Sequence, residues 1–215
     1  MSNPDNELKP LKLSCTETDC GNDLHCFQRS KKLAKANQSG KCRECGADLI
    51  DWPRVHRRDS LDAPYLVKAF QFEWIRHRYW HIPLTEYAIN YARRKGRRLL
   101  REAVRRQIES AVGKPNHPRQ GRQTSWETNP KATAVHFAQH ATASCCRKCV
   151  EEWHAIPVDV DLTTEQLDYL TELAMRYVVE RIPDLGTEPV SVPRRSASRA
   201  LNSGSPAPNR LQYAS

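Results

Sequence analysis

Cysteines and histidines that could bind a metal ion are concentrated in the stretch His136–His154. Thiolate and imidazole ligands at this density are typical of a tetrahedral zinc site. Cys146 and Cys149 have the CxxC spacing of a zinc knuckle, in which a tight turn directs two sulfurs at one ion. His140 precedes this pair and His154 follows it, so these four residues form the ligand set expected for a C-terminal zinc site.

Two alternatives to metal binding remain for this stretch. A redox CxxC is one, since Arg147 and Lys148 would lower a thiol pKa, but that motif usually follows a βαβ pattern and the flanks here are helical in pattern. Inert buried thiols are the other. Cys145 is left out of the expected set because adjacent cysteines do not easily point at one tetrahedral ion, although it and His136 stay open as ligands.

A second group of cysteines lies nearer the N-terminus. Cys42-Arg-Glu-Cys45 again has knuckle spacing, and Gly46 follows where a positive φ is often needed. With Cys20 and Cys26 upstream, the chain has two cysteine pairs about twenty residues apart, which is a strong indication of a structural zinc site. These four cysteines are the expected ligands.

The upstream half of that N-terminal set is ambiguous. Cys15 and Cys20 form another plausible pair, and His25 precedes Cys26 directly. Since one ion takes four ligands, Cys15 and His25 remain alternates.

Histidines outside the expected ligand sets are candidates for catalysis. His56 follows the first knuckle, and this placement of a histidine loosely resembles the His-metal finger nucleases. In those enzymes a histidine activates water and a divalent metal holds the phosphate. His77 and His81 are four residues apart, and His136 is a further candidate. Packing or solvent contact is the favoured alternative for each, because few acidic residues lie nearby in sequence.

Composition favours an anionic partner in a reducing compartment. The 215-residue chain has a net charge of +9, 39% hydrophobic residues and eight cysteines, with a mean hydropathy of −0.74. Such charge favours nucleic acid first, a membrane surface second and an acidic protein third. Without a signal-peptide core at the polar N-terminus or a long apolar run, we expect a cytoplasmic protein with metal rather than disulfides and no membrane span.

The densest charge lies in one expected helix, in which residues 93–106 include eight basic residues and one acid, Glu102. Leu100, Val104 and Ile108 form an apolar stripe, so the arginines should cover the other face. Arginine suits bidentate phosphate contact. The expected nucleic-acid-binding residues are Arg93, Arg94, Arg97, Arg98, Arg101, Arg105 and Arg106.

The elements that must position these residues are mainly helices. Pro64 suits a helix start and Pro83 a helix end, while Thr163 and Gln166 match a capping box before the clearest helix. The expected organisation is a flexible arm (1–12), an N-terminal zinc module (13–60), a basic helical segment (61–112), a linker (113–131), a C-terminal Cys/His zinc module with its helix (132–183) and a disordered tail (184–215).

Short strings in both cysteine regions carry a family resemblance. They include Leu24-His-Cys-Phe27, Cys42-Arg-Glu-Cys-Gly46, Ala138-Gln-His-Ala-Thr142, Cys145-Cys-Arg-Lys-Cys149 and Trp153-His-Ala-Ile-Pro157. The chain resembles an uncharacterised family of bacterial proteins, a domain of unknown function, over about residues 15–183. The resemblance implies one architecture for both clusters and assigns no chemistry.

These observations favour a zinc-stabilised basic protein that holds about two zinc ions per chain and binds nucleic acid through the arginine-rich helix. The metal is then structural, and the protein is not expected to be an enzyme. A metal-dependent hydrolase or nuclease is one alternative, and an adaptor that binds a protein partner is another.

Overall fold

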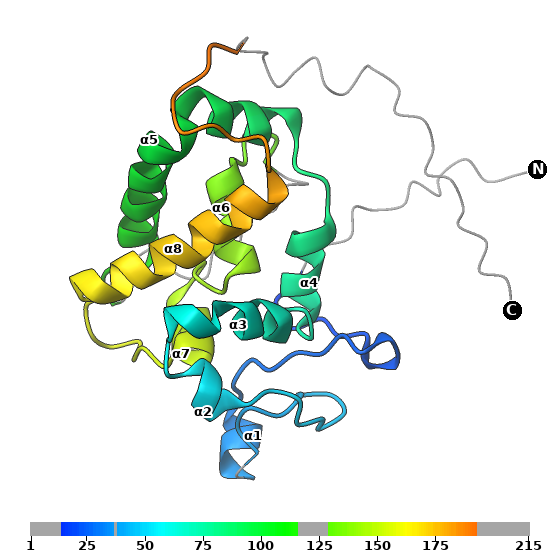
Figure 1. Ribbon diagram of the computed structural model, residues 1–215. Helices are drawn as coiled ribbons and strands as arrows, with labels where there is room; N and C mark the ends of the chain where they lie inside the picture. Colours follow the sequence, from blue (N-terminus) through cyan, green and yellow to red (C-terminus); the bar gives the residue numbers. More distant parts are fainter. Residues whose placement is uncertain (1–13, 37, 116–128, 193–215) are drawn as a thin grey trace, which may run out of the picture.

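The protein is built from α-helices in its computed structural model, which describes residues 14–36, 38–115 and 129–192 (Figure 1). Within these ranges there is no β-strand, only the isolated bridges Asp19–Leu24 and His25–Glu73. The prediction of a mainly helical fold is therefore confirmed. The helices are α1 (Lys31–Lys35), α2 (Trp52–Val55), α3 (Ala63–Phe70), α4 (Trp74–His81), α5 (Glu86–Val112), α6 (Ala134–Ala141), α7 (Arg147–His154) and α8 (Thr164–Arg181), with short 3-10 turns η1 (Cys20–Asn22) and η2 (Ser60–Asp62).

Local signals explain where the longer helices begin. At α8 the Thr163 side chain accepts a hydrogen bond from the Gln166 backbone, and Gln166 accepts one from the Thr163 backbone, which is the expected capping box. At α5 the Thr85 side chain accepts from Ala88 N–H. Pro64 lies in the first turn of α3, where its missing N–H costs nothing.

Helix α5 breaks at Gly96, whose φ of 62° and ψ of 170° are not helical. The break frees the N–H groups of Arg97 and Arg98, which donate to the carbonyls of Gly186 and Thr187. Val190 N–H returns a hydrogen bond to Arg93 O at 2.9 Å. The segment after α8 is thereby fixed along α5, as Figure 1 shows.

The larger core lies where α5, α6 and α8 pack on one another, with α4 against α6. The stripe Leu100, Val104 and Ile108 is completely buried, as its helical spacing predicts. Leu170 and Tyr177 face it from α8, and the Tyr177 hydroxyl donates to Tyr79 O in α4.

A second core joins the N-terminal region to α7 and α8. Phe27 and Val55 pack there with Phe70 of α3 and Trp153 of α7, and the Trp153 ring lies 4.7 Å from that of Phe70. Cysteines of both sequence clusters belong to this core, so the two cysteine regions share one packed interior.

The segments expected to be linker and tail are only partly described. Residues 184–192 pack along α5, and Leu185 is buried, although their composition suggested disorder. Residues 116–128 of the expected linker, the expected arm up to residue 13 and the tail from residue 193 lie outside the described residues. No helix in the described ranges is long and apolar enough to cross a membrane.

Candidate metal centres and the arginine groove

Cys20, His25, Cys42 and Cys45 place their ligand atoms within 4.8 Å of one another. Cys20 Sγ and Cys42 Sγ are 3.8 Å apart, and Cys45 Sγ lies 3.4 Å from His25 Nδ1. Two thiolates on one zinc, each with a bond of about 2.3 Å, are separated by roughly 3.8 Å in a tetrahedron. The N-terminal cluster therefore has the size of a zinc coordination shell.

The knuckle turn prepares Cys42 to act as a thiolate. Gly46 has a φ of 76°, and its N–H donates to Cys42 O at 3.0 Å, which closes the turn after Cys45. Burial would raise the pKa of Cys42, but backbone hydrogen bonds from Cys45, Cys26 and Glu44 outweigh it and lower the pKa to about 6. A thiolate is the form that binds metal.

The fourth member of the N-terminal cluster is His25, whereas the cysteine spacing had favoured Cys26 as that ligand. The backbone of His25 is fixed by hydrogen bonds with Phe72 O and Trp74 N–H, and its Nε2 lies 3.6 Å from a carboxylate oxygen of Asp23. This separation is longer than a hydrogen bond, so the Asp23 carboxylate lies near the far ring nitrogen without bonding to it. In the sequence, the short spacing between Cys20 and His25 was the feature that could have indicated His25 as a ligand.

Cys26 points away from the cluster because alternation of the extended chain turns it to the opposite side from His25. It is completely buried, and its Sγ donates to Cys15 O at 3.3 Å. Burial raises the pKa of the Cys26 thiol to about 11, which disfavours a thiolate there.

Cys145, Cys146 and Cys149 form the second cluster, with all three Sγ atoms within 4.8 Å. Cys146 Sγ lies 3.5 Å from Cys149 Sγ. The side chains of Cys145 and Cys146 therefore both point toward Cys149, although adjacent cysteines were expected to point in different directions. The turn that allows this includes Ala143, whose φ is 55°.

A buried arginine borders this second cluster. Arg76 of α4 is 1% exposed, and its Nη2 donates to Cys149 Sγ at 2.9 Å while its Nη1 lies 3.7 Å from Cys145 Sγ. Its Nε donates to Glu73, which also accepts from the Trp153 indole at 2.8 Å. Hydrogen bonds from the Cys145, Cys146 and Cys15 side chains lower the pKa of Cys149 well below its ordinary value, and Arg76 adds to this.

The structure does not bring His140 or His154 to these cysteines. The His154 ring is buried and lies between Tyr169 Oη at 3.1 Å and Thr142 O at 3.0 Å, so both its nitrogens have partners. The His140 ring stacks on Tyr79 with centroids 4.5 Å apart. Neither histidine belongs to the group of three cysteines, and His140 Nδ1 is buried without a hydrogen-bond partner among the described residues.

The four histidines considered for catalysis make structural contacts. His56 Nε2 lies 2.9 Å from Glu152 O. His136 Nδ1 accepts a hydrogen bond from the backbone N–H of Thr133, the residue that precedes α6. His77 and His81 stack with centroids 4.0 Å apart. In the described ranges, none of them belongs to a group of residues able to hold a metal ion.

Most of the expected nucleic-acid-binding arginines have partners inside the protein. Arg93 pairs with Asp184 at 2.6 Å, Arg101 with Glu172 at 2.5 Å and Arg105 with Asp168 at 3.1 Å. Arg97 Nε donates to Leu185 O, and Arg106 lies 3.7 Å from Glu102. Most of these acids lie in α8 or in the segment after it. Because they are far from the arginines in sequence, the charge pattern of α5 alone could not predict these ion pairs. Arg94 is half-buried on the same helix.

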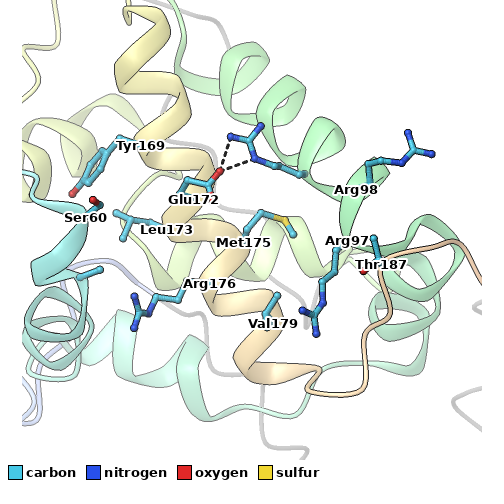
Figure 2. A pocket seen from close by; sticks show the side chains of 12 residues that line it. Ser60, Arg97, Arg98, Tyr169, Glu172, Leu173, Met175, Arg176, Val179 and Thr187 are labelled. Atoms are coloured by element: carbon cyan, nitrogen blue, oxygen red, sulfur yellow. Dashed lines mark hydrogen bonds and ion pairs between the residues drawn. The ribbon is translucent and has the colours of Figure 1, made fainter.

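A groove of about 590 Å³ lies along α8, beside α5 and the start of η2. Figure 2 shows Arg97 and Arg176 on opposite sides of α8, with Arg98 extending away from it. Met175, Leu173 and Val179 give the floor an apolar character. Its other lining residues are Ser60, Ala63, Arg101, Tyr169, Glu172 and Thr187.

Residues 64–179 match the model of a family described as "Domain of unknown function (DUF4186)". The match covers more than half of the chain, so the protein belongs to this family, which confirms the resemblance to a domain of unknown function. The matched segment contains the second cysteine cluster and Arg76, whereas the N-terminal cluster precedes it. No solved structure matches the chain.

Proposed function

We propose that the protein is a zinc-stabilised nucleic-acid-binding protein, with a structural zinc ion at Cys20, His25, Cys42 and Cys45. The observation that carries the zinc assignment is the set of four converging ligand atoms within 4.8 Å. Three sulfurs and one imidazole nitrogen suit zinc and fill a tetrahedral shell. A shell filled by protein ligands has no open position for substrate, which favours a structural ion.

The zinc proposal is tested by metal analysis of matched cysteine variants. Cys42→Ser should lose about one zinc ion per chain, because Cys42 is one of four ligands. Cys26→Ser is the control, since Cys26 is equally buried and its sulfur binds a backbone carbonyl instead. Equal zinc content in the two variants would contradict the assignment.

Nucleic acid is the partner that best fits the groove over α8. Arg98 and Arg176 line it and are exposed, and neither side chain has an acidic partner among the described residues. Glu172 also lines the groove but pairs with Arg101, so the guanidinium groups of Arg98 and Arg176 beside the apolar floor suit a phosphodiester with a base or sugar against the protein. The net charge of +9 has the same sign as the groove and would raise the rate of encounter.

The hydrolase alternative has less support than nucleic-acid binding. Groups able to hold a metal ion in the described part of the chain consist of cysteine and histidine only. A divalent metal that activates phosphate hydrolysis prefers oxygen ligands. A protein adaptor remains the competitor, and a negative result in the binding experiment would favour it.

The binding experiment measures affinity for single-stranded and duplex oligonucleotides over a range of salt concentration. We expect log Kd to rise steeply with log salt, by about 0.9 for each phosphate contacted on duplex DNA. Arg98→Gln with Arg176→Gln should weaken binding and reduce that slope by about two, because two phosphate contacts are lost.

The matched control removes two positive charges elsewhere. Lys41→Gln with Arg106→Gln makes the same change in net charge, but both side chains already pair with acids outside the groove. It should leave affinity nearly unchanged. Equal weakening by the two double variants would reject the groove as the binding surface, and no binding at low salt would reject the nucleic-acid proposal.

A further inference from the structure

We propose that Cys15 completes a second zinc site with Cys145, Cys146 and Cys149, so that one ion joins the N-terminal segment to the DUF4186 domain. Three of these sulfurs already converge within 4.8 Å. Three protein ligands and an open position would describe a catalytic site, whereas four cysteines close the shell. The identity of the fourth group therefore decides what this cluster can do.

Cys15 lies in the N-terminal segment, whereas Cys145, Cys146 and Cys149 lie in α7 or directly before it. The Cys15 side chain is among the groups that lower the pKa of Cys149, although its sulfur is not one of the three that lie within 4.8 Å of one another. Its backbone is fixed by the hydrogen bond that Cys26 Sγ donates to Cys15 O at 3.3 Å. The separation of 3.5 Å between Cys146 Sγ and Cys149 Sγ is close to the roughly 3.8 Å of two thiolates on one zinc ion.

Arg76 indicates that the sulfurs act as acceptors and not as donors. A guanidinium group has only N–H donors, and burial makes an unsatisfied donor costly. At Cys149 and Cys145 these donors meet sulfur at 2.9 and 3.7 Å. A thiolate accepts hydrogen bonds far better than a thiol, and a metal ion keeps the thiolate form at neutral pH.

Burial of Cys146 and Cys149 favours metal over redox chemistry at this cluster, in which Cys145 is partly exposed. Cys149 is 4% exposed and Cys146 is 7% exposed. Reactive or redox-sensing cysteines need access to a partner thiol or an oxidant. Of the two histidines expected as ligands, His154 has hydrogen-bond partners at both nitrogens, and His140 stacks on Tyr79 and does not belong to the group of three cysteines.

A zinc ion at this place would crosslink residues more than a hundred positions apart. Such a crosslink removes conformational freedom from the unfolded chain and so stabilises the packed state. It would also explain why a segment outside the family match lies against α7. The second site rests on the proposed zinc chemistry of the protein but uses none of the ligands of the first site.

Zinc content of the purified full chain and four cysteine variants tests the proposal. We expect about two zinc ions for the parent and for Cys26→Ser, and about one for Cys42→Ser, Cys149→Ser and Cys15→Ser. A parent with one ion that only Cys42→Ser removes would overturn the second site and leave the first intact. A full complement of zinc in Cys15→Ser would reject Cys15 as the fourth ligand.

Cobalt substitution provides a second measurement, since Cys149→Ser can fail to fold for reasons of packing alone. Cobalt in the parent should show sulfur-to-metal charge-transfer absorption that falls by one thiolate in Cys15→Ser and stays unchanged in Cys26→Ser. An identical cobalt spectrum for all three proteins would overturn the proposal. So would a metal-free parent in which Cys146 and Cys149 are joined by a disulfide.

Discussion

Arg76 Nη2 lies 2.9 Å from Cys149 Sγ, and this contact joins α4 to α7 inside the second core. The same guanidinium donates to Glu73, whose carboxylate is buried beneath the Trp153 indole. A charged group with 1% exposure is stable only when every donor has an acceptor. Arg76 therefore ties the cysteine cluster to the packing of the domain.

Replacing Arg76 with methionine should destabilise the protein by roughly 3–5 kcal/mol, because Glu73 would keep a buried charge without its partner. Urea-induced unfolding measures the change. Lys148→Met is the control, since Lys148 is exposed on the helix that carries Cys149. A difference between the two variants of less than about 1 kcal/mol would show that the Arg76 contacts contribute little.

Replacing Gly96 with alanine should lower the free energy of unfolding by at least about 2 kcal/mol, since alanine adopts this φ poorly. A Cβ there would also overlap the backbone of Thr187 and Glu188. Thermal unfolding provides the measurement. Gly186→Ala is the control in the same contact, because its Cβ would meet only Glu188 O at 3.9 Å. Equal stability of both variants would show that the break in α5 is not required.

Stability should fall on acidification partly through His154. Burial lowers its pKa to about 3 in the folded protein, against an ordinary value of 6.5. Above pH 6.5 neither state binds the proton, whereas below it the unfolded chain takes up a proton that the folded protein excludes. The loss should approach about 1.4 kcal/mol per pH unit for this residue.

Unfolding by urea between pH 7.5 and 5.5 measures that loss. His154→Gln should show a shallower decline than the parent, whatever its stability at pH 7.5. Zinc content is followed in each sample because acid also releases metal from thiolates. Parallel slopes for parent and His154→Gln would refute the role of His154.

Local patterns in the sequence predicted the features that depend on near neighbours. The Cys42–Cys45 knuckle, the capping box at Thr163 and the buried stripe of Leu100 on α5 all follow from spacing. Each needs only a turn or a helical repeat to form, so a few residues contain the whole signal.

Features that depend on tertiary contacts could not be predicted from local patterns in the sequence. His25 joins the first cluster because its backbone pairs with the turn between α3 and α4. Arg101 meets an acid on α8 that lies far away in sequence. Gly96 indicated a weaker helix, but its neighbours Thr187 and Glu188 explain why the chain breaks there.

Zinc-edge X-ray absorption on the purified 215-residue chain, combined with its zinc content, tests whether both cysteine clusters hold zinc. We expect about two zinc ions per chain. Their shell should be dominated by sulfur at about 2.3 Å, with a minor nitrogen contribution at about 2.0 Å from His25. A well-folded protein that carries no zinc, or zinc surrounded mainly by nitrogen and oxygen, would contradict it.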